Sequence, residues 1–253
     1  MKQTFILWAS ALILTFLTGY IQSGISEYFP VTGTIGIDGK KVSYRFEKIF
    51  NDQGNYIFII RTDNPDIEAE LKWKHISESE YNSIKMDKVK EALTAEIPRQ
   101  PAGKKILHFA EIKKDGEKYT VPDKPVELLF QGYVPPMISF LSSFALLGGL
   151  FLSYRTGLSA IGGIIENKKI KKFSLFTFAF FFVYSIAVTP LRKSFELDAI
   201  NKKVVPITEL YDLQSILLFL LWIAAIIFIF KTRIGKEASL VFAVATALVF
   251  LFT

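Results

Sequence analysis

The polar residues that could bind a ligand gather in one stretch between two apolar runs, residues 190–213. Arg192 lies near its start, and Glu209 and Asp212 lie near its end. A connection of this length without a regular pattern is typical of a functional or a disordered segment. Two interpretations follow. Arg192 and an acidic partner form a ligand site, or the stretch is a solvated loop whose prolines end the flanking helices.

Few other residues could support catalysis or hold a cofactor. The sequence has no cysteine and two histidines, His75 and His108, both outside the apolar runs. Thiolate chemistry, disulfides and a bis-histidine haem between apolar helices are therefore excluded. Glu209 and Asp212 form the one weak acidic pair that could serve an enzyme acting on envelope lipids. We predict a protein that is not an enzyme and that holds no cofactor or metal.

Arg155 is a further candidate contact residue, because it follows directly on an apolar run that ends at Tyr154. An arginine there is typical of a surface anchor, with its stem in the apolar layer and its head in water. Contact with a ligand or partner is the alternative. The apolar runs themselves contain no Asp, Glu, Lys, Arg or His, which argues against a proton-coupled transporter.

The apolar runs predict membrane-spanning helices. Hydrophobic residues make up 51% of the 253 residues, and they gather in runs near the roughly 20 residues that cross a bilayer. Four such runs form a membrane domain over residues 136–253, at about 137–154, 173–188, 214–230 and 238–253. The run in residues 1–23 is an anchor or a cleaved signal peptide. Bulky Tyr20 and Ile21 favour the anchor.

The distribution of positive charge predicts the orientation. With the N-terminus inside, the inner loops hold eight lysines and arginines and the outer membrane loop holds four, as expected from the cytoplasmic bias of these residues. Residues 24–135 then lie outside the cytoplasm. Since the net charge of +6 gathers beside apolar runs, we expect membrane lipids and a membrane or periplasmic protein as partners, and no nucleic acid.

Residues 24–135 have the pattern of an exported all-β domain. Apolar residues alternate in short runs, and Asp38-Gly39 and Asp115-Gly116 favour tight hairpins. Seven strands are predicted, at residues 32–37, 42–46, 56–60, 68–73, 93–97, 106–112 and 126–130. Regular short strands of this kind are typical of a β-sandwich.

Two resemblances add to this pattern. Residues 93–103 contain Ile-Pro-Arg-Gln-Pro-Ala-Gly and resemble the strand and turn of fibronectin-type-III-like bacterial modules, which usually bind or space rather than catalyse. Residues 32–47 and 155–161 are similar to stretches of a family of uncharacterised bacterial membrane proteins. The loop at 190–213 departs from that family's pattern, which is richer in aromatic residues, glycine and aspartate. The resemblances imply an immunoglobulin-like sandwich and a small helical bundle in the bacterial inner membrane.

These observations predict a mixed membrane protein, with an immunoglobulin-like sandwich outside the membrane and a transmembrane bundle of about five helices. We expect its exported domain to bind a partner protein or to help assemble a membrane complex. The alternative is a transport or sensing component with its ligand site in residues 190–213. The sequence specifies neither the partner nor the oligomeric state.

Overall fold

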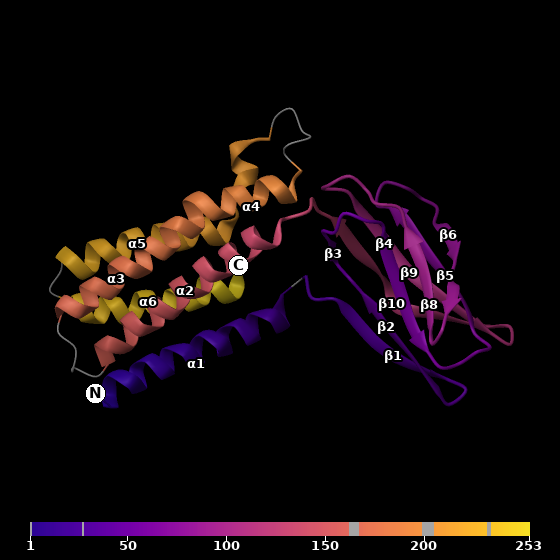
Figure 1. Cartoon of the computed structure of the whole chain (residues 1–253), viewed down its shortest axis with the longest axis horizontal. Helices are drawn as coiled ribbons and strands as arrows, with labels where there is room; N and C mark the ends of the chain where they lie inside the picture. Colours follow the sequence, from indigo (N-terminus) through magenta and orange to yellow (C-terminus); the bar gives the residue numbers. More distant parts are fainter. Residues whose placement is uncertain (1, 27, 162–166, 199–204, 232–233) are drawn as a thin grey trace. The chain divides into compact units, whose positions relative to one another are not determined.

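The computed structural model describes residues 2–26, 28–161, 167–198, 205–231 and 234–253 (Figure 1). The chain forms two compact units. The β unit comprises Glu27–Tyr133 with Glu196–Asp198, and the helical unit comprises Met1–Ser26, Val134–Phe195 and Ala199–Thr253. The predicted combination of β-sheets with long apolar helices is confirmed.

The β unit contains ten described strands. They are β1 (Val31–Ile37), β2 (Lys40–Phe46), β3 (Ile49–Phe50), β4 (Tyr56–Thr62), β5 (Glu68–His75), β6 (Asn82–Lys85), β7 (Asp87–Val89), β8 (Ala92–Ile97), β9 (Lys105–Lys114) and β10 (Glu117–Phe130). All seven predicted strands lie within observed ones. The predictions missed β3, β6, β7 and the first part of β10, because these segments are short or lack regular alternation of apolar residues.

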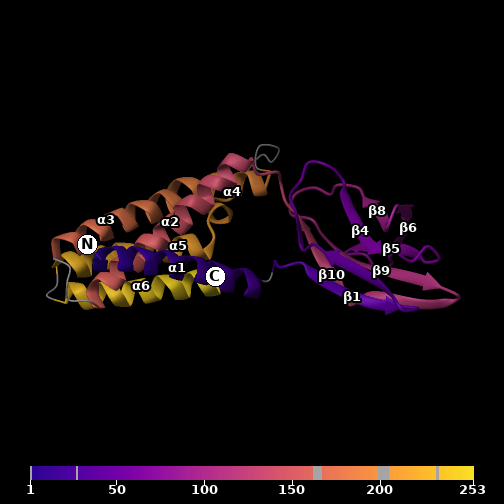
Figure 2. The ribbon, with the colours of Figure 1, turned by 60° about the horizontal axis from the view of Figure 1, so that its bottom comes forward.

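The strands form two five-stranded sheets (Figures 1 and 2). The first sheet has the order β1-β2-β4-β8-β7, and the second has the order β3-β10-β9-β5-β6. Alternate residues point inward from each sheet, as β4 shows with its strict alternation of buried and exposed residues. The buried side chains of both sheets form one hydrophobic core, in which Phe46 and Phe58 of the first sheet lie with Ile106 and Phe130 of the second.

The β1–β2 hairpin turns at Asp38-Gly39, as predicted. Both residues have positive φ, 49° and 73°, which is the backbone of a tight primed turn and is easiest for aspartate, asparagine and glycine. The turn fixes a continuous register from Val31 opposite Phe46 to Ile37 opposite Lys40. β1 therefore lies at the edge of the first sheet, with β2 on one side.

The helical unit contains helices that run side by side (Figures 1 and 2). They are α1 (Lys2–Ile25), α2 (Pro136–Ile161), α3 (Asn167–Phe182), α4 (Thr189–Glu196), α5 (Leu213–Lys231) and α6 (Gly235–Phe252), with a π-helix at Val183–Val188 and a 3-10 helix at Ile207–Leu210. Among the described residues, five helices are long and apolar enough to cross a membrane. The third of these runs without a break from Asn167 to Glu196.

The helix through Pro190 corrects the prediction that the third apolar run stops at Thr189-Pro190. Proline has no N–H group, and its ring collides with the carbonyl four residues earlier in a regular α-helix. The π-helix Val183–Val188 precedes the proline, and the N–H of Thr189 bonds to the carbonyl of Tyr184, five residues back. This wider turn lets the helix continue. The predicted loop therefore begins with helix α4, and its residues 199–204 lie outside the described residues.

Two adjacent glycines of α2, Gly148 and Gly149, allow close helix packing. A Cβ atom on Gly148 would lie 2.4 Å from the Phe180 ring, and one on Gly149 would lie 2.7 Å from the Phe181 ring. Neither gap leaves room for a side chain. Small residues thus set the spacing between α2 and α3.

Candidate functional site

The structure pairs Arg192 with Asp212. An Nη atom of Arg192 lies 3.1 Å from the Asp212 carboxylate, and both side chains are about a quarter exposed. Asp212 also accepts the backbone N–H of Ser215 at 2.8 Å, which makes it the N-terminal cap of α5. Glu209 lies exposed in the short 3-10 helix. Asp212 therefore has a structural role that needs no ligand, as the partner of Arg192 and the cap of α5.

Arg155 lies inside helix α2, because the helix continues to Ile161 and does not end at Tyr154. Its side chain is buried, with 1% of the residue exposed, and does not extend into water as a surface anchor would. The guanidinium lies 4.9 Å from the centre of the Trp8 ring and 4.8 Å from that of Phe173. It donates a hydrogen bond to Ser159. Arg155 thus links α1, α2 and α3, and no described carboxylate forms an ion pair with it.

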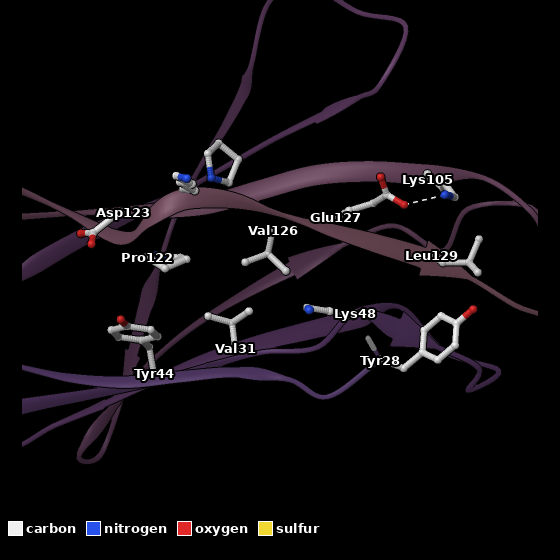
Figure 3. Close-up of a pocket in the computed structure, with 12 residues that line it drawn as sticks. Tyr28, Val31, Tyr44, Lys48, Lys105, Pro122, Asp123, Val126, Glu127 and Leu129 are labelled. Carbon is white, nitrogen blue, oxygen red and sulfur yellow. Dashed lines mark ion pairs between the residues drawn. The ribbon is translucent and has the colours of Figure 1, made fainter. Parts of the chain in front are cut away.

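A cleft of about 870 Å³ in the β unit, which we call the edge cleft, is lined by charged and aromatic side chains (Figure 3). Val31 and Tyr44 line it from β1 and β2, and Pro122 and Val126 line it from β10. The full lining is Tyr28, Val31, Tyr44, Lys48, Lys105, Pro122, Asp123, Lys124, Pro125, Val126, Glu127 and Leu129. The edge cleft thus opens between the margins of the two sheets.

A break in strand pairing shapes one wall of the edge cleft. β10 pairs with β9 up to Val121 and again from Val126, with a register shift between these residues. The intervening segment contains Pro122 and Pro125, which have no N–H to offer to a neighbouring strand. The backbone of this segment therefore forms no regular ladder with β9, and its side chains line the cleft.

His108 hydrogen-bonds to β10 at Val126, where β10 resumes its pairing with β9. Its Nδ1 atom lies 2.9 Å from the carbonyl oxygen of Val126. A carbonyl oxygen only accepts, so Nδ1 carries the hydrogen and Nε2 is unprotonated. The ring is fully buried among Phe46, Tyr56 and Phe58. Burial lowers the pKa of His108 to about 4, against the opposing effect of the bond to Val126.

The edge cleft combines an apolar floor with a charged rim. Val31, Val126 and Leu129 supply apolar surface, and Tyr28 adds an aromatic ring that is 61% exposed. On the rim, Lys105 and Glu127 form an ion pair at 2.6 Å, and the hydrogen bond to Glu127 raises the pKa of Lys105. Such a mixture of apolar floor and polar rim suits the recognition of another molecule.

Tyr44 lies flat over Gly33 at one end of the edge cleft. A Cβ atom on Gly33 would lie 2.2 Å from the Tyr44 hydroxyl oxygen, so only glycine fits beneath the ring. The two residues are directly opposite each other in the β1–β2 pair. Gly33 therefore fixes where the aromatic ring lies.

The two outer sheet faces of the β unit differ in how their charges are paired. On the second sheet, Glu70 bonds to Lys72 and Lys113, and these bonds lower the pKa of Glu70 to about 2. The first sheet instead exposes Ile57 and Ile59 of β4, which are 59% and 43% exposed. Three cationic side chains also point outward from this sheet, namely Lys41, Arg45 and Arg61. Within the described residues, Arg45 pairs with Glu47, and neither Lys41 nor Arg61 forms an ion pair.

Sequence reasoning missed the edge cleft. Its walls come from segments about Tyr28–Lys48 and Lys105–Leu129, which belong largely to different sheets and come together where the two sheets pack. The Pro-Asp-Lys-Pro segment at 122–125 was the one local sign of the cleft in the sequence. Two prolines inside an otherwise alternating run argue against a regular strand there.

Comparison with known proteins does not assign the chain to a family. No family model matches the sequence, and no curated protein matches it. Among solved structures, one similar chain is the crystal structure of the Br derivative of BhCBM56. It has 10% sequence identity and a TM-score of 0.26, and the match covers 41% of this chain and 95% of that chain. A likeness at this TM-score establishes neither the fold nor the ligand.

Proposed function

We propose that this chain is a non-enzymatic integral membrane protein whose β unit lies outside the cytoplasm and docks a partner protein. The single observation that carries the proposal is the edge cleft, with its apolar floor, exposed tyrosine and charged rim. The two-sheet architecture supports the immunoglobulin-like sandwich that the sequence resemblance implies, and sandwiches of that type commonly serve as binding modules. The function follows from the site and not from the fold alone.

The surface of the helical unit supports insertion in a membrane. Large apolar side chains are exposed along several helices, among them Phe5 at 75%, Phe16 at 70% and Val241 at 64%. A water-soluble protein rarely exposes so much contiguous apolar surface, whereas a bilayer solvates it. The five long apolar helices supply the spans. The excess of lysine and arginine in the loops assigned to the inside supports a position of the β unit on the opposite side.

The chemistry of the edge cleft supports binding over catalysis. Its ion pair between Lys105 and Glu127 satisfies both groups. His108 lies behind the wall in the core, where its ring cannot reach a bound molecule. A partner protein can bury the floor and complement the rim without any of these groups reacting.

Photo-crosslinking in intact cells tests this proposal. A photoreactive amino acid replaces Tyr28 in the cleft, or Ser79 in an exposed turn as the matched control. We expect a discrete protein adduct from position 28 and none from position 79. The adduct should disappear when Asp123→Lys and Lys124→Asp are combined, which exchanges the rim charges and conserves the net charge. An adduct that survives this exchange, or no protein adduct at position 28, would contradict the proposal.

A further inference from the structure

The strands at the edges of the two sheets are not equally protected against pairing with another chain. Proteins usually blunt an exposed edge with charge, proline, a bulge or a very short strand. β7 carries Asp87 and Lys88, β6 ends in Lys85, and β3 has only two residues. β1 has seven residues and contains no charged residue and no proline. Among the described edge strands, β1 is therefore the long and unprotected one.

The backbone of β1 is regular along its full length. Its register with β2 runs without a shift from Val31 to Ile37. Alternate residues of such a strand direct their N–H and C=O groups away from the paired neighbour. β1 consequently presents an ordered row of donors and acceptors beside the edge cleft, to which Val31 already belongs.

Side chains on the two faces of β1 determine what an added strand would meet. On its inward side, Val31 lines the edge cleft together with Val126, whereas Ile35 and Ile37 pack in the hydrophobic core. Its outward side has only Thr32, Thr34 and Gly36, which are exposed and small. These small residues leave room for longer side chains of an added strand to reach across β1 to the next strand.

The next strand carries positive charge at the matching positions. Thr32 lies opposite Arg45, and Gly36 lies opposite Lys41. Strands are spaced by roughly 4.8 Å, so a strand added to β1 lies about two spacings from β2, within reach of paired long side chains. Acidic residues on the outward side of the added strand would complement Lys41 and would compete with Glu47 for Arg45.

We infer that β1 binds an extended segment of the partner protein by strand addition, and that this segment alternates acidic residues on its outer side with apolar residues facing the edge cleft. The inference rests on the proposed docking function and names the chemistry of the partner. Main-chain hydrogen bonds supply affinity in this mode, and the alternating side chains supply specificity. A second copy of the chain fits less well, because a second β1 strand has no acidic side chain to complement Lys41 or Arg45.

Peptide binding to the full chain in detergent tests the inference. The probe is a short labelled peptide that alternates glutamate with valine. Four control peptides are compared with it. One replaces glutamate with lysine, one has a scrambled order, and two carry N-methyl groups on the backbone amides of one edge or of the other. We expect the first peptide to bind. We expect the lysine and scrambled peptides, and one of the two N-methylated forms, to lose about tenfold or more in affinity. Equal binding of the lysine or the scrambled peptide, or of both N-methylated forms, would overturn strand addition.

Variants of the protein test whether the peptide binds beside β1 and β2. The double variant Lys41→Glu and Arg45→Glu should weaken the glutamate peptide about tenfold and strengthen the lysine peptide. The matched double variant Lys85→Glu and Lys104→Glu reverses two exposed charges elsewhere on the β unit and should leave both affinities unchanged. Equal effects of the two double variants would overturn the inference.

A cysteine at the middle of β1 tests the second-copy alternative. The chain has no cysteine of its own, and Thr34 is the central residue of β1. An antiparallel pair of two β1 strands would place the two residues at position 34 side by side, so Thr34→Cys would form a disulfide-linked dimer in membranes. Such a dimer would overturn the inference, and a monomer supports it. A partner adduct at position 28 together with failed peptide binding would leave the docking function standing and remove strand addition alone.

Discussion

His108 donates its Nδ1–H to the carbonyl oxygen of Val126 over 2.9 Å, and thereby ties the core of the β unit to the wall of the edge cleft. The bond lies where β10 resumes pairing with β9 after the proline-containing segment. The Nε2 atom of the same ring is buried without a hydrogen-bond partner. Any proton added at Nε2 would put a charge in an apolar core, so this contact is sensitive to acid.

We predict that the β unit loses stability between about pH 6.5 and pH 4. The pKa of His108 falls from its ordinary value of 6.5 to about 4 in the folded protein. In this window the unfolded chain binds a proton that the folded chain does not, so stability falls as the pH falls through it. The full effect is roughly 3 kcal/mol.

Histidine NMR signals of the full chain give the direct measurement of this prediction. The variant His75→Gln leaves His108 as the single histidine. The remaining signal should stay in its neutral form until the pH approaches 4. A titration near pH 6.5 in the folded protein would contradict the burial that the structure shows for this ring.

A second prediction compares two glycines of β1. Gly33→Ala places a Cβ atom against the Tyr44 ring, whereas Gly36→Ala meets nothing within 4 Å. We expect Gly33→Ala to shift the ring and to cost about 1–3 kcal/mol, with reduced crosslinking at position 28. Gly36→Ala should change stability by no more than about 0.5 kcal/mol. Chemical unfolding of both variants measures the difference, and equal values would refute the ring-over-glycine contact.

A third prediction concerns the spacing of α2 in the helical unit. Gly157→Ala puts its Cβ atom 2.5 Å from the Cβ of Ala243 in α6, and Gly149→Ala puts it against Phe181. Both should lower the melting temperature in detergent, because neither site has room for a methyl group. Gly19→Ala, in open space on α1, is the matched control. An equal response of all three variants would contradict the close packing of α2.

A fourth prediction separates the cap role of Asp212 from a ligand role. Asp212→Asn keeps an oxygen that can accept the Ser215 N–H but loses the charge that pairs with Arg192. Asp212→Ala loses both contacts and should destabilise the helical unit by about 1 kcal/mol more than the asparagine variant. Thermal unfolding in detergent compares them. If both variants were as stable as the parent and lost a ligand-dependent response, the transport or sensing interpretation would replace docking.

A fifth prediction concerns the membrane orientation. Because the chain lacks cysteine, single substitutions can be labelled in intact cells with a maleimide that does not cross membranes. Ser79→Cys in the β unit and Glu209→Cys should be labelled, and Lys168→Cys and Lys236→Cys should be labelled only after the membrane is opened. The reversed pattern would contradict the positive-inside assignment.

The sequence predicted most of the regular structure because local patterns determine it. Alternation located β2, a continuous apolar run located β4, and the Asp-Gly dipeptide located the turn between β1 and β2. Pro190 led to a wrong prediction of a helix end, since the π-helix Val183–Val188 before it lets the helix continue through the proline. Arg155 was placed at a helix end because the apolar run stops there, although α2 continues for about two further turns and Arg155 is buried.

The edge cleft could not be predicted in the same way. Tyr28 and Val126 are far apart in the sequence, and no local pattern states that they line one cavity. The exposed edge of β1 likewise depends on strand order, which alternation does not encode. Long-range strand order and the packing of the two sheets therefore create the candidate site, whereas local patterns create the strands that line it.

Quantitative co-purification of the full chain in mild detergent tests the central claim most directly. The parent chain is compared with the rim exchange Asp123→Lys and Lys124→Asp and with the control variant Lys85→Glu. We predict a stoichiometric partner protein with the parent and with Lys85→Glu, and its loss from the rim exchange. A chain that purifies alone in every form, or a partner retained equally by the rim exchange, would contradict docking at the edge cleft.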